Sequence, residues 1–338
     1  WLKTIFSIVL LLIFFPASGF LSQLINYPHL EMIYWAIIGS IFIEIYSYSY
    51  LVLSSRHQFL QLSLLGILQA LIKLISFGVI IWFFSSNLLS ITAFYYLAPA
   101  VAVLIISFFL KEKIFYKPKI ASYKIRAEMN KFWFHSGVGV AMMTLIGNLD
   151  ILLIQRFLNS FETGVYAGAA RIAAFMATLS GSIGIVLISR VSRYKNRADI
   201  IKYLKKSSIL VLAAIVGFVL YLPFSSLLIK YTIGPEYLSG NLATIFLVGN
   251  SFLGLILVPL TAVFYTLNKP SYFSINGFIQ VACILIGTLL FIGQYGIMAA
   301  AISRIAATIL SIGYRLLSVY LVLKKDKKEL VIYFKTPA

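Results

Sequence analysis

Three charged side chains lie inside long apolar segments, where a charge is costly. Asp150, Arg171 and Arg304 each fall within a different apolar run. An ionisable side chain near the centre of a bilayer costs roughly 2.5–3.5 kcal/mol on insertion scales, and such residues usually serve transport or substrate binding. Two arginines and one aspartate leave a net positive charge, and arginine holds phosphate oxygens through two parallel hydrogen bonds. The three residues therefore predict a substrate-binding site for a phosphate or pyrophosphate group.

The three side chains are expected at one depth in the membrane. Each lies about seven residues from the same boundary of its segment, which is roughly 10 Å at 1.5 Å per residue. A shared depth is what a common polar site requires. Two other interpretations stay open. Asp150 and Arg171 could form a structural pair while Arg304 extends its side chain to the surface, or Asp150 could couple a proton or an ion.

A second charged pair is expected earlier in the chain. Glu44 and Lys73 flank the turn at Arg56 by about 12 and 17 residues, so their depths differ by roughly 8 Å. Both lie near the expected bilayer centre, where an unpaired charge is least tolerable. They are candidates for ion coupling or gating, or for a plain stabilising contact. Arg315 lies nearer a span end, and we expect its side chain to reach the membrane surface.

These residues sit in a chain with the composition of a multi-pass membrane protein. Hydrophobic residues make up 61% of it and charged residues 11%, against about 25% charged residues in soluble domains. A membrane-spanning helix needs about 20 mostly apolar residues. The predicted fold class is therefore an all-α transmembrane helix bundle of ten spans, at 4–25, 30–53, 58–84, 88–110, 133–157, 164–188, 207–230, 240–265, 271–292 and 297–322.

The connectors alternate in charge, which predicts their side of the membrane. Those at 54–57, 111–132, 189–206 and 266–270 carry basic residues, whereas the intervening ones are nearly uncharged or acidic. Basic loops favour the cytoplasmic side, so both ends of this chain are expected there. The net charge of +18 is explained by this bias and by attraction to anionic membrane lipids. No soluble domain carries a basic patch, so no nucleic-acid partner is expected.

The longest connector divides the chain. We expect a partial first lobe of four helices at 1–110, a basic inter-lobe loop at 111–132, a second lobe of six helices at 133–323, and a basic cytoplasmic tail at 324–338. Two equal halves would require two more helices at the amino end. The chain opens on Trp1 inside an apolar run, so we expect it to be truncated there.

Two segments resemble a known transporter family. The run NLDILLIQRFLNSFETGVYAGAARI (148–172) is similar to the start of the second half of polysaccharide flippases, and FYTLNKPSYFSINGFIQVACILIGTLLFIGQYGIMAAAISRI (264–305) is similar to their last three helices. These flippases belong to the multidrug/oligosaccharidyl-lipid/polysaccharide exporter superfamily. The resemblance implies a twelve-helix protein of two lobes around a central cavity, of which this chain holds spans three to twelve.

The same resemblance implies the function and its partners. The expected activity is the flipping of lipid-linked (polyprenyl-pyrophosphate) oligosaccharide across the bacterial plasma membrane, for surface polysaccharide such as the O-antigen of lipopolysaccharide. Lipid-linked oligosaccharide is the expected substrate, and other polysaccharide assembly proteins are further expected partners.

The sequence offers little for catalysis. It contains no P-loop, dinucleotide-binding glycine motif, HExxH or GxSxG. His29, His57 and His135 do not cluster, and Cys283 is the sole cysteine. We therefore expect no enzyme, no metal and no cofactor. Two alternatives remain: a multidrug exporter of the same superfamily, which would favour a more acidic cavity, and a polytopic glycan polymerase, which would favour a larger external loop.

Overall fold

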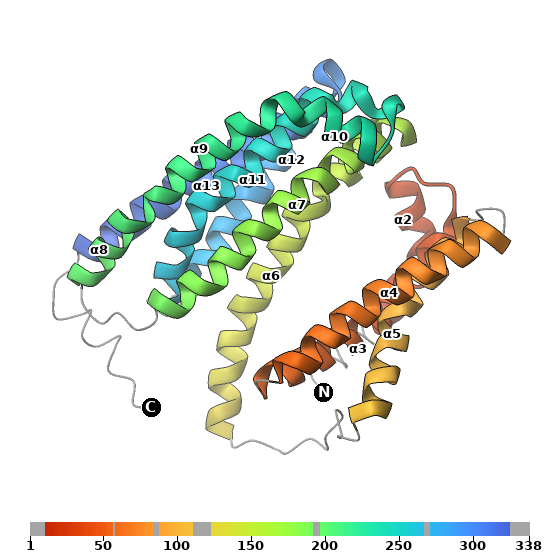
Figure 1. The fold of residues 1–338 in the computed structure, drawn as a ribbon, viewed down its shortest axis with the longest axis horizontal. Coiled ribbons are helices and arrows are strands. Elements are labelled where there is room, and N and C mark those ends of the chain that lie inside the picture. Colours follow the sequence, from red (N-terminus) through yellow and green to blue (C-terminus); the bar gives the residue numbers. More distant parts are fainter. Residues whose placement is uncertain are drawn as a thin grey trace. The chain divides into compact units, whose positions relative to one another are not determined.

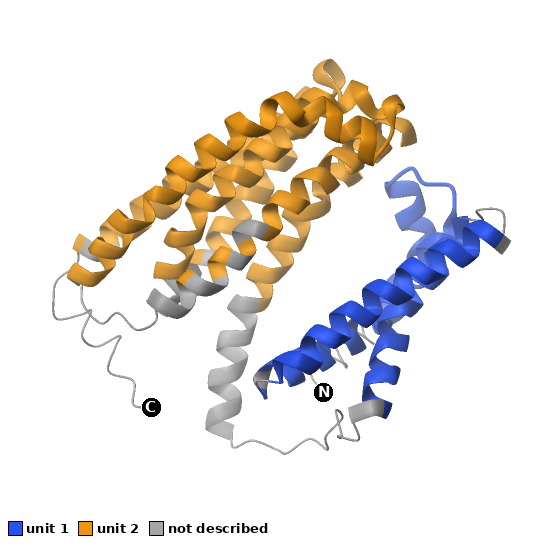
Figure 2. Ribbon diagram, viewed as in Figure 1, with its two compact units in different colours: residues 1–121 blue, residues 122–338 orange. Residues whose placement is uncertain are grey.

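The computed structural model is helical and divides into two compact units. It describes residues 11–56, 58–83, 88–110, 123–191, 197–266 and 271–324. Residues 1–121 form unit 1 and residues 122–338 form unit 2 (Figure 2). Every regular element in these described ranges is a helix. The predicted all-α class is confirmed.

The helices follow one another with short connections (Figure 1). Unit 1 contains α2 (Ser18–Leu24), α3 (Leu30–Ser55), α4 (Phe59–Phe83) and α5 (Leu88–Leu110). Unit 2 contains α6 (Tyr123–Phe157), α7 (Ser160–Val191), α8 (Arg197–Ser207), α9 (Ile209–Tyr221), η1 (Leu222–Phe224), α10 (Ser225–Thr232), η2 (Pro235–Gly240), α11 (Asn241–Thr266), α12 (Ser271–Tyr295) and α13 (Ile297–Lys324).

Eight segments of the described chain are long and apolar enough to cross a membrane. They are 30–54, 59–82, 88–108, 137–157, 198–232, 235–263, 274–295 and 297–321. Helices suit these segments because a backbone in lipid must satisfy its own hydrogen bonds. The predicted spans 4–25 and 164–188 are not among the eight, and residues 1–10 lie outside the described residues. The count of ten spans stays a prediction.

Two predicted connectors contain helical structure. Helix α6 begins at Tyr123, inside the segment predicted as the basic loop 111–132, and α8 occupies much of the predicted connector 189–206. In α8 the apolar residues Ile200 and Tyr203 are buried. Their spacing of three places them on one helix face, so the basic residues around them do not prevent helix formation.

Unit 1 is built around α5, which packs against both α3 and α4. Its core consists of the buried side chains Leu53, Leu65, Ala102, Val103 and Ile106. Helices α3 and α5 approach closely at Gly39, where a Cβ atom would lie 2.3 Å from the ring of Tyr96. A glycine is required there because any side chain would overlap that ring.

Unit 2 is built around α11, which packs against α7, α9 and α13. Helix α12 packs against α6 and α13. The core between α7 and α11 uses small or tightly packed residues, including Val165, Tyr166, Ala169, Ala173 and Leu247. Small residues allow the close backbone approach that stabilises helix pairs in membranes. This arrangement brings residues of α6, α7 and α13 together in the interior of unit 2.

Candidate functional site

The interior of unit 2 contains an ion pair between Asp150 on α6 and Arg304 on α13. Arg304 Nε lies 3.0 Å from Asp150 Oδ2, and Arg304 Nη2 donates a hydrogen bond to Oδ1 at 3.3 Å. The Asp150 side chain is fully buried, and 15% of the Arg304 side chain is exposed. The guanidinium also donates to the Ile146 carbonyl. The structure therefore brings together Asp150 and Arg304, two of the three residues predicted for the substrate site.

Two further groups satisfy the Asp150 carboxylate. The Tyr166 hydroxyl on α7 donates to Oδ2 at 2.5 Å, and the backbone N–H of Ile151 donates to Oδ1 at 3.0 Å. Tyr166 is itself fully buried. A buried ion pair is stable only where further hydrogen bonds satisfy its remaining polar atoms. Asp150 meets this requirement with donors from three helices.

The turn between α12 and α13 sets the position of Arg304. Gly296 ends α12 with a φ of +54°, and its N–H bonds to the Ile292 carbonyl. Glycine adopts this left-handed backbone without steric cost. Ala300, Ala301 and Ala307 are buried on α13, so α13 packs closely enough for the Arg304 guanidinium to reach α6.

The short turn between α6 and α7 positions Tyr166. The Asn159 side-chain oxygen accepts a hydrogen bond from the backbone N–H of Glu162 at 2.9 Å, and the Asn159 carbonyl accepts one from the Thr163 hydroxyl. This is the N-cap arrangement that satisfies free N–H groups at a helix start. Tyr166 follows two turns later on the buried face. The sequence did not single out Tyr166, because a single tyrosine is common in membrane helices. Its spacing of three and seven residues from Ala169 and Ala173 places it on the small-residue face of α7, and this spacing could have indicated that it is buried.

Arg171 lies on the other side of α7. It is exposed, and at 3.6 residues per turn it points about 140° away from Tyr166. The predicted common site of three charges is therefore divided: Asp150 and Arg304 meet in the interior, and Arg171 belongs to the outward face of α7.

The outward faces of α6 and α7 carry small and polar residues beside a few large apolar ones, such as Met143 and Phe175. The exposed or half-exposed residues on these faces are Thr144, Asn148, Gly164, Ala167, Arg171, Ala174, Thr178 and Gly181. By contrast, α9 exposes large apolar side chains, including Leu212, Ile215 and Leu220. Lipid favours the surface of α9, whereas an arginine among small residues suits a water-filled space. We call these eight small and polar residues of α6 and α7 the polar face.

The charged residues of unit 1 are arranged separately. The Lys73 ammonium on α4 lies 3.8 Å from the centre of the Tyr95 ring on α5. A cation over an aromatic face is stabilised by the ring quadrupole, more strongly away from water. Glu44 is half-buried on α3. The predicted pairing of Glu44 with Lys73 stays a prediction.

The expectation for Arg315 was wrong. Arg315 is only 4% exposed, and its guanidinium donates a hydrogen bond to the Thr261 hydroxyl on α11. One turn earlier on the same helix, the Ser311 hydroxyl donates to the Asn276 side-chain oxygen at 2.8 Å. Arg315 lies on the face of α13 that packs against α11. Its depth near a span end predicted a side chain at the membrane surface, but helix packing turns the side chain inward.

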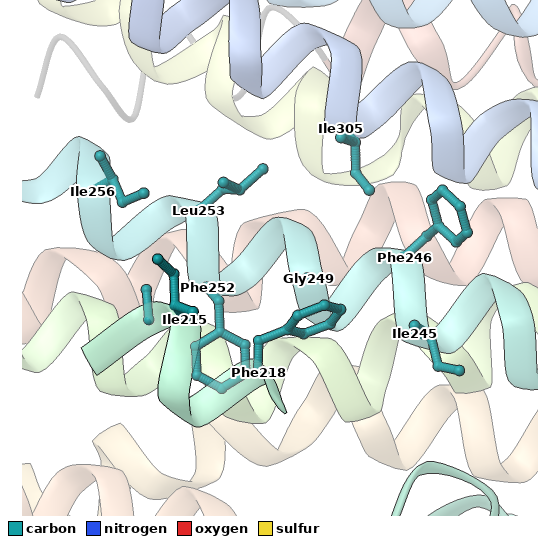
Figure 3. A pocket seen from close by; sticks show the side chains of 10 residues that line it. Ile215, Phe218, Ile245, Phe246, Gly249, Phe252, Leu253, Ile256 and Ile305 are labelled. Carbon is teal, nitrogen blue, oxygen red and sulfur yellow. The ribbon is translucent and has the colours of Figure 1, made fainter. Parts of the chain in front are cut away.

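An apolar cavity of about 380 Å³ lies among α9, α11 and α13. Figure 3 shows Phe218 from α9 beside the α11 backbone at Gly249, with Phe252 and Ile305 also lining the space. All of its lining side chains are apolar. A charged headgroup would lose its hydration there without gaining partners, so this cavity is not a candidate for the phosphate site.

Comparison with known proteins gives a family and a fold. A family model described as polysaccharide biosynthesis protein matches residues 1–240. Among solved structures, "Lipid II flippase MurJ, inward closed conformation" is similar with a TM-score of 0.77 and 15% sequence identity, over 94% of this chain and 70% of that chain. The search of curated proteins found no match. At this identity the structural likeness shows a shared fold.

Proposed function

This chain belongs to the polysaccharide biosynthesis protein family, and from that membership we propose that it flips lipid-linked oligosaccharide across a membrane. The family match confirms the predicted resemblance and covers the first of the two sequence segments, 148–172. The shared fold with a lipid II flippase supports the same kind of activity, because that protein also flips a lipid. The proposed process moves a molecule without making or breaking covalent bonds.

Arg171 carries this proposal at the residue level. It is exposed within a long helix of unit 2, among small residues that leave room beside it. A guanidinium can hold a pyrophosphate through paired hydrogen bonds while the lipid chain stays in the bilayer. Asp150 and Arg304, predicted for the same substrate site, are proposed to support it by holding α6, α7 and α13 together.

The proposed architecture follows the sequence predictions. Ten spans would place both ends of this chain in the cytoplasm of a bacterium, with the protein in the plasma membrane. Two lobes would alternate between inward-open and outward-open states, as in other transporters built from paired bundles. Glu44 and Lys73 are proposed gating residues of the first lobe. Their charges at the helix interior support this role.

A deletion strain tests the flippase directly. Loss of the gene should leave complete lipid-linked repeat units on the cytoplasmic leaflet, and the full-length gene should restore their transfer. Unpolymerised units on the outer leaflet would instead identify a polymerase. An unchanged glycan with altered drug efflux would identify a multidrug exporter.

Substitution of Arg171 tests the proposed contact. Arg171→Ala should lower the flipping rate roughly tenfold or more, because a lost charge-assisted pair of hydrogen bonds is worth more than 1.4 kcal/mol. Arg171→Lys keeps the charge and should retain part of the rate. Phe175→Ala, an exposed apolar residue one turn later, is the matched control and should flip normally. Normal flipping by Arg171→Ala in folded protein would exclude Arg171 from the substrate site.

A further inference from the structure

A second cavity lies among α7, α8 and α9, with a volume of about 400 Å³. One part of its lining is charged, with Asp199, Lys202 and Lys206 from α8. Another part is apolar, with Leu187 from α7 and Leu210 from α9. A cavity that joins charged and apolar walls fits a ligand that has both characters.

Helix α8 is firmly held, so the cavity walls have a defined position. Ile200 is fully buried and Tyr203 is 7% exposed. Both pack in a cluster with Leu260 and Val263 from α11 and Val319 from α13. Lys202 and Lys206 are exposed, but the helix that carries them is anchored to two membrane-spanning helices.

The charges in the cavity favour a singly charged anion. Lys202 and Lys206 are four residues apart, so they lie on one helix side and repel each other. Asp199 lies one turn before Lys202 and offsets one of the two positive charges. The remaining net charge of about +1 matches a phosphodiester, which carries one negative charge, and an anion between the lysines would relieve their repulsion.

The cavity lies at the depth of lipid headgroups. The apolar part of this span begins at Ile209, where α9 starts, and Figure 1 shows α8 continuing into α9. At 1.5 Å per residue, Lys206 lies about 4.5 Å before Ile209 and Lys202 about 10 Å before it. The headgroup layer begins at the hydrocarbon boundary and is roughly 5–7 Å thick on each side. Lys206 therefore falls within that layer, and Lys202 lies just beyond it, where its long side chain can still reach the layer.

We propose that this cavity binds the phosphodiester headgroup of one anionic phospholipid. Lys202 and Lys206 hold the phosphate, and the first part of an acyl chain lies along Leu187 and Leu210. The site belongs to unit 2 alone and is separate from the polar face. The proposal does not depend on flipping activity.

Native mass spectrometry of the purified full chain in detergent tests the site. Phosphatidylglycerol is the probe, and detergent removes the general attraction of an anionic membrane surface. The wild-type chain should bind one molecule with saturation. Replacing both Lys202 and Lys206 with Ala should weaken binding about thirtyfold, because each lysine near a headgroup contributes about a fivefold factor.

Two variants on the same helix make the test specific. Lys205→Ala removes an equal charge from an exposed residue of α8 that does not line the cavity, so its affinity should change less than twofold. Asp199→Asn raises the net charge of the cavity and should strengthen binding about fivefold. This gain cannot result from misfolding.

The remaining outcomes would overturn the proposal. Equal affinity in the Lys205→Ala variant and the Lys202, Lys206 double variant would show that the cavity does not bind the headgroup. Displacement of phosphatidylglycerol by inorganic phosphate at matched concentration would indicate a site for a free anion. Equal binding of phosphatidylcholine would show that the lipid charge is not recognised.

Discussion

Asp150 shows how one buried charge is compensated by three helices. Its carboxylate accepts hydrogen bonds from Tyr166 on α7, from its own helix at Ile151 and from Arg304 on α13. Each carboxylate oxygen therefore already has partners. A substrate phosphate would be repelled by this carboxylate, and a coupling ion would have to displace the guanidinium. The contacts favour a structural role for the pair.

Replacing Arg304 should destabilise unit 2. Arg304→Met removes the cation and leaves the buried Asp150 charge without compensation, which should cost about 3 kcal/mol. Thermal unfolding followed by helical circular dichroism in detergent would measure the loss. Adding Asp150→Asn removes the uncompensated charge, so the double variant should be more stable than Arg304→Met alone. A double variant that is less stable than either single variant would contradict a structural ion pair.

Tyr166 should contribute through its hydroxyl group. Tyr166→Phe removes the hydrogen bond to the Asp150 carboxylate, and hydrogen bonds to charged groups contribute about 1.5–3 kcal/mol. Tyr221→Phe is the control, because the Tyr221 hydroxyl is buried without a hydrogen-bond partner in the described part of the chain. Tyr221→Phe should leave the unfolding temperature unchanged or raise it. An equal effect of both changes would refute the assigned role of Tyr166.

The sequence predicted the depth of the charged residues but not their direction. Counting from span ends placed Asp150, Arg171 and Arg304 at one level. The direction of each side chain depends on helix rotation, and apolar residues surround a membrane helix on both its packed and its lipid-facing sides. The pattern therefore did not reveal that Arg171 turns away from Tyr166, or that Arg315 turns inward.

At the level of elements, α6 and α12 approach each other closely at Gly277, where a side chain would not fit. A Cβ atom at Gly277 would lie 2.6 Å from the Met142 Cβ on α6. That atom is attached to the backbone, so it cannot rotate aside as the end of a long side chain could. The two helices must therefore separate if Gly277 acquires a side chain.

Gly277→Ala should lower the stability of unit 2 by about 1–3 kcal/mol, the usual cost of overpacking. The α6 helix carries Asp150, so the flipping rate should fall as well. Gly254→Ala on α11 is the control, because a Cβ atom there meets nothing within 4 Å and alanine favours the helix by up to about 1 kcal/mol. Thermal unfolding of both variants would measure the difference. A Gly277→Ala protein as stable as Gly254→Ala would show that the contact is loose.

Hydropathy predicted the helices better than it predicted their ends. The cores of most spans agree with the helices because continuous apolar stretches have few alternatives to a helix in lipid. Helix α8 was missed because its lysines resemble a loop, although Ile200 and Tyr203 recur at helical spacing. Pro223 interrupts the predicted span 207–230 at η1, where the ring removes a backbone donor.

For the whole molecule, charge placement and family membership point to the same kind of protein. The basic residues gather in alternate connectors, and the interior charges of unit 2 have partners or lie on the polar face. The proposed substrate, a charged lipid that carries sugar, would have to pass a hydrocarbon layer about 30 Å thick. A polar face with one arginine inside the membrane suits this task.

The topology can be tested through α7, a predicted span that is not among the eight apolar segments of the described chain. Replacing Cys283 with Ala removes the sole cysteine. New cysteines at Glu162, in the first turn of α7, and at Lys205, on α8, then report the segments before and after the predicted span. Helix α7 contains 32 residues, or about 48 Å at 1.5 Å per residue, which exceeds the hydrocarbon thickness. A membrane-impermeant thiol reagent should label position 162 from outside the cell, and position 205 only after the membrane is opened.

Labelling of both positions from the same side would mean that α7 does not cross the membrane. The alternation of basic connectors would then fail, because the segments before α6 and after α7 could no longer share the cytoplasm. Arg171 would also lose its place inside the bilayer, and with it the reason to assign it to the pyrophosphate. Labelling on opposite sides would place Arg171 between the two surfaces, where a flippase must hold the charged part of its substrate.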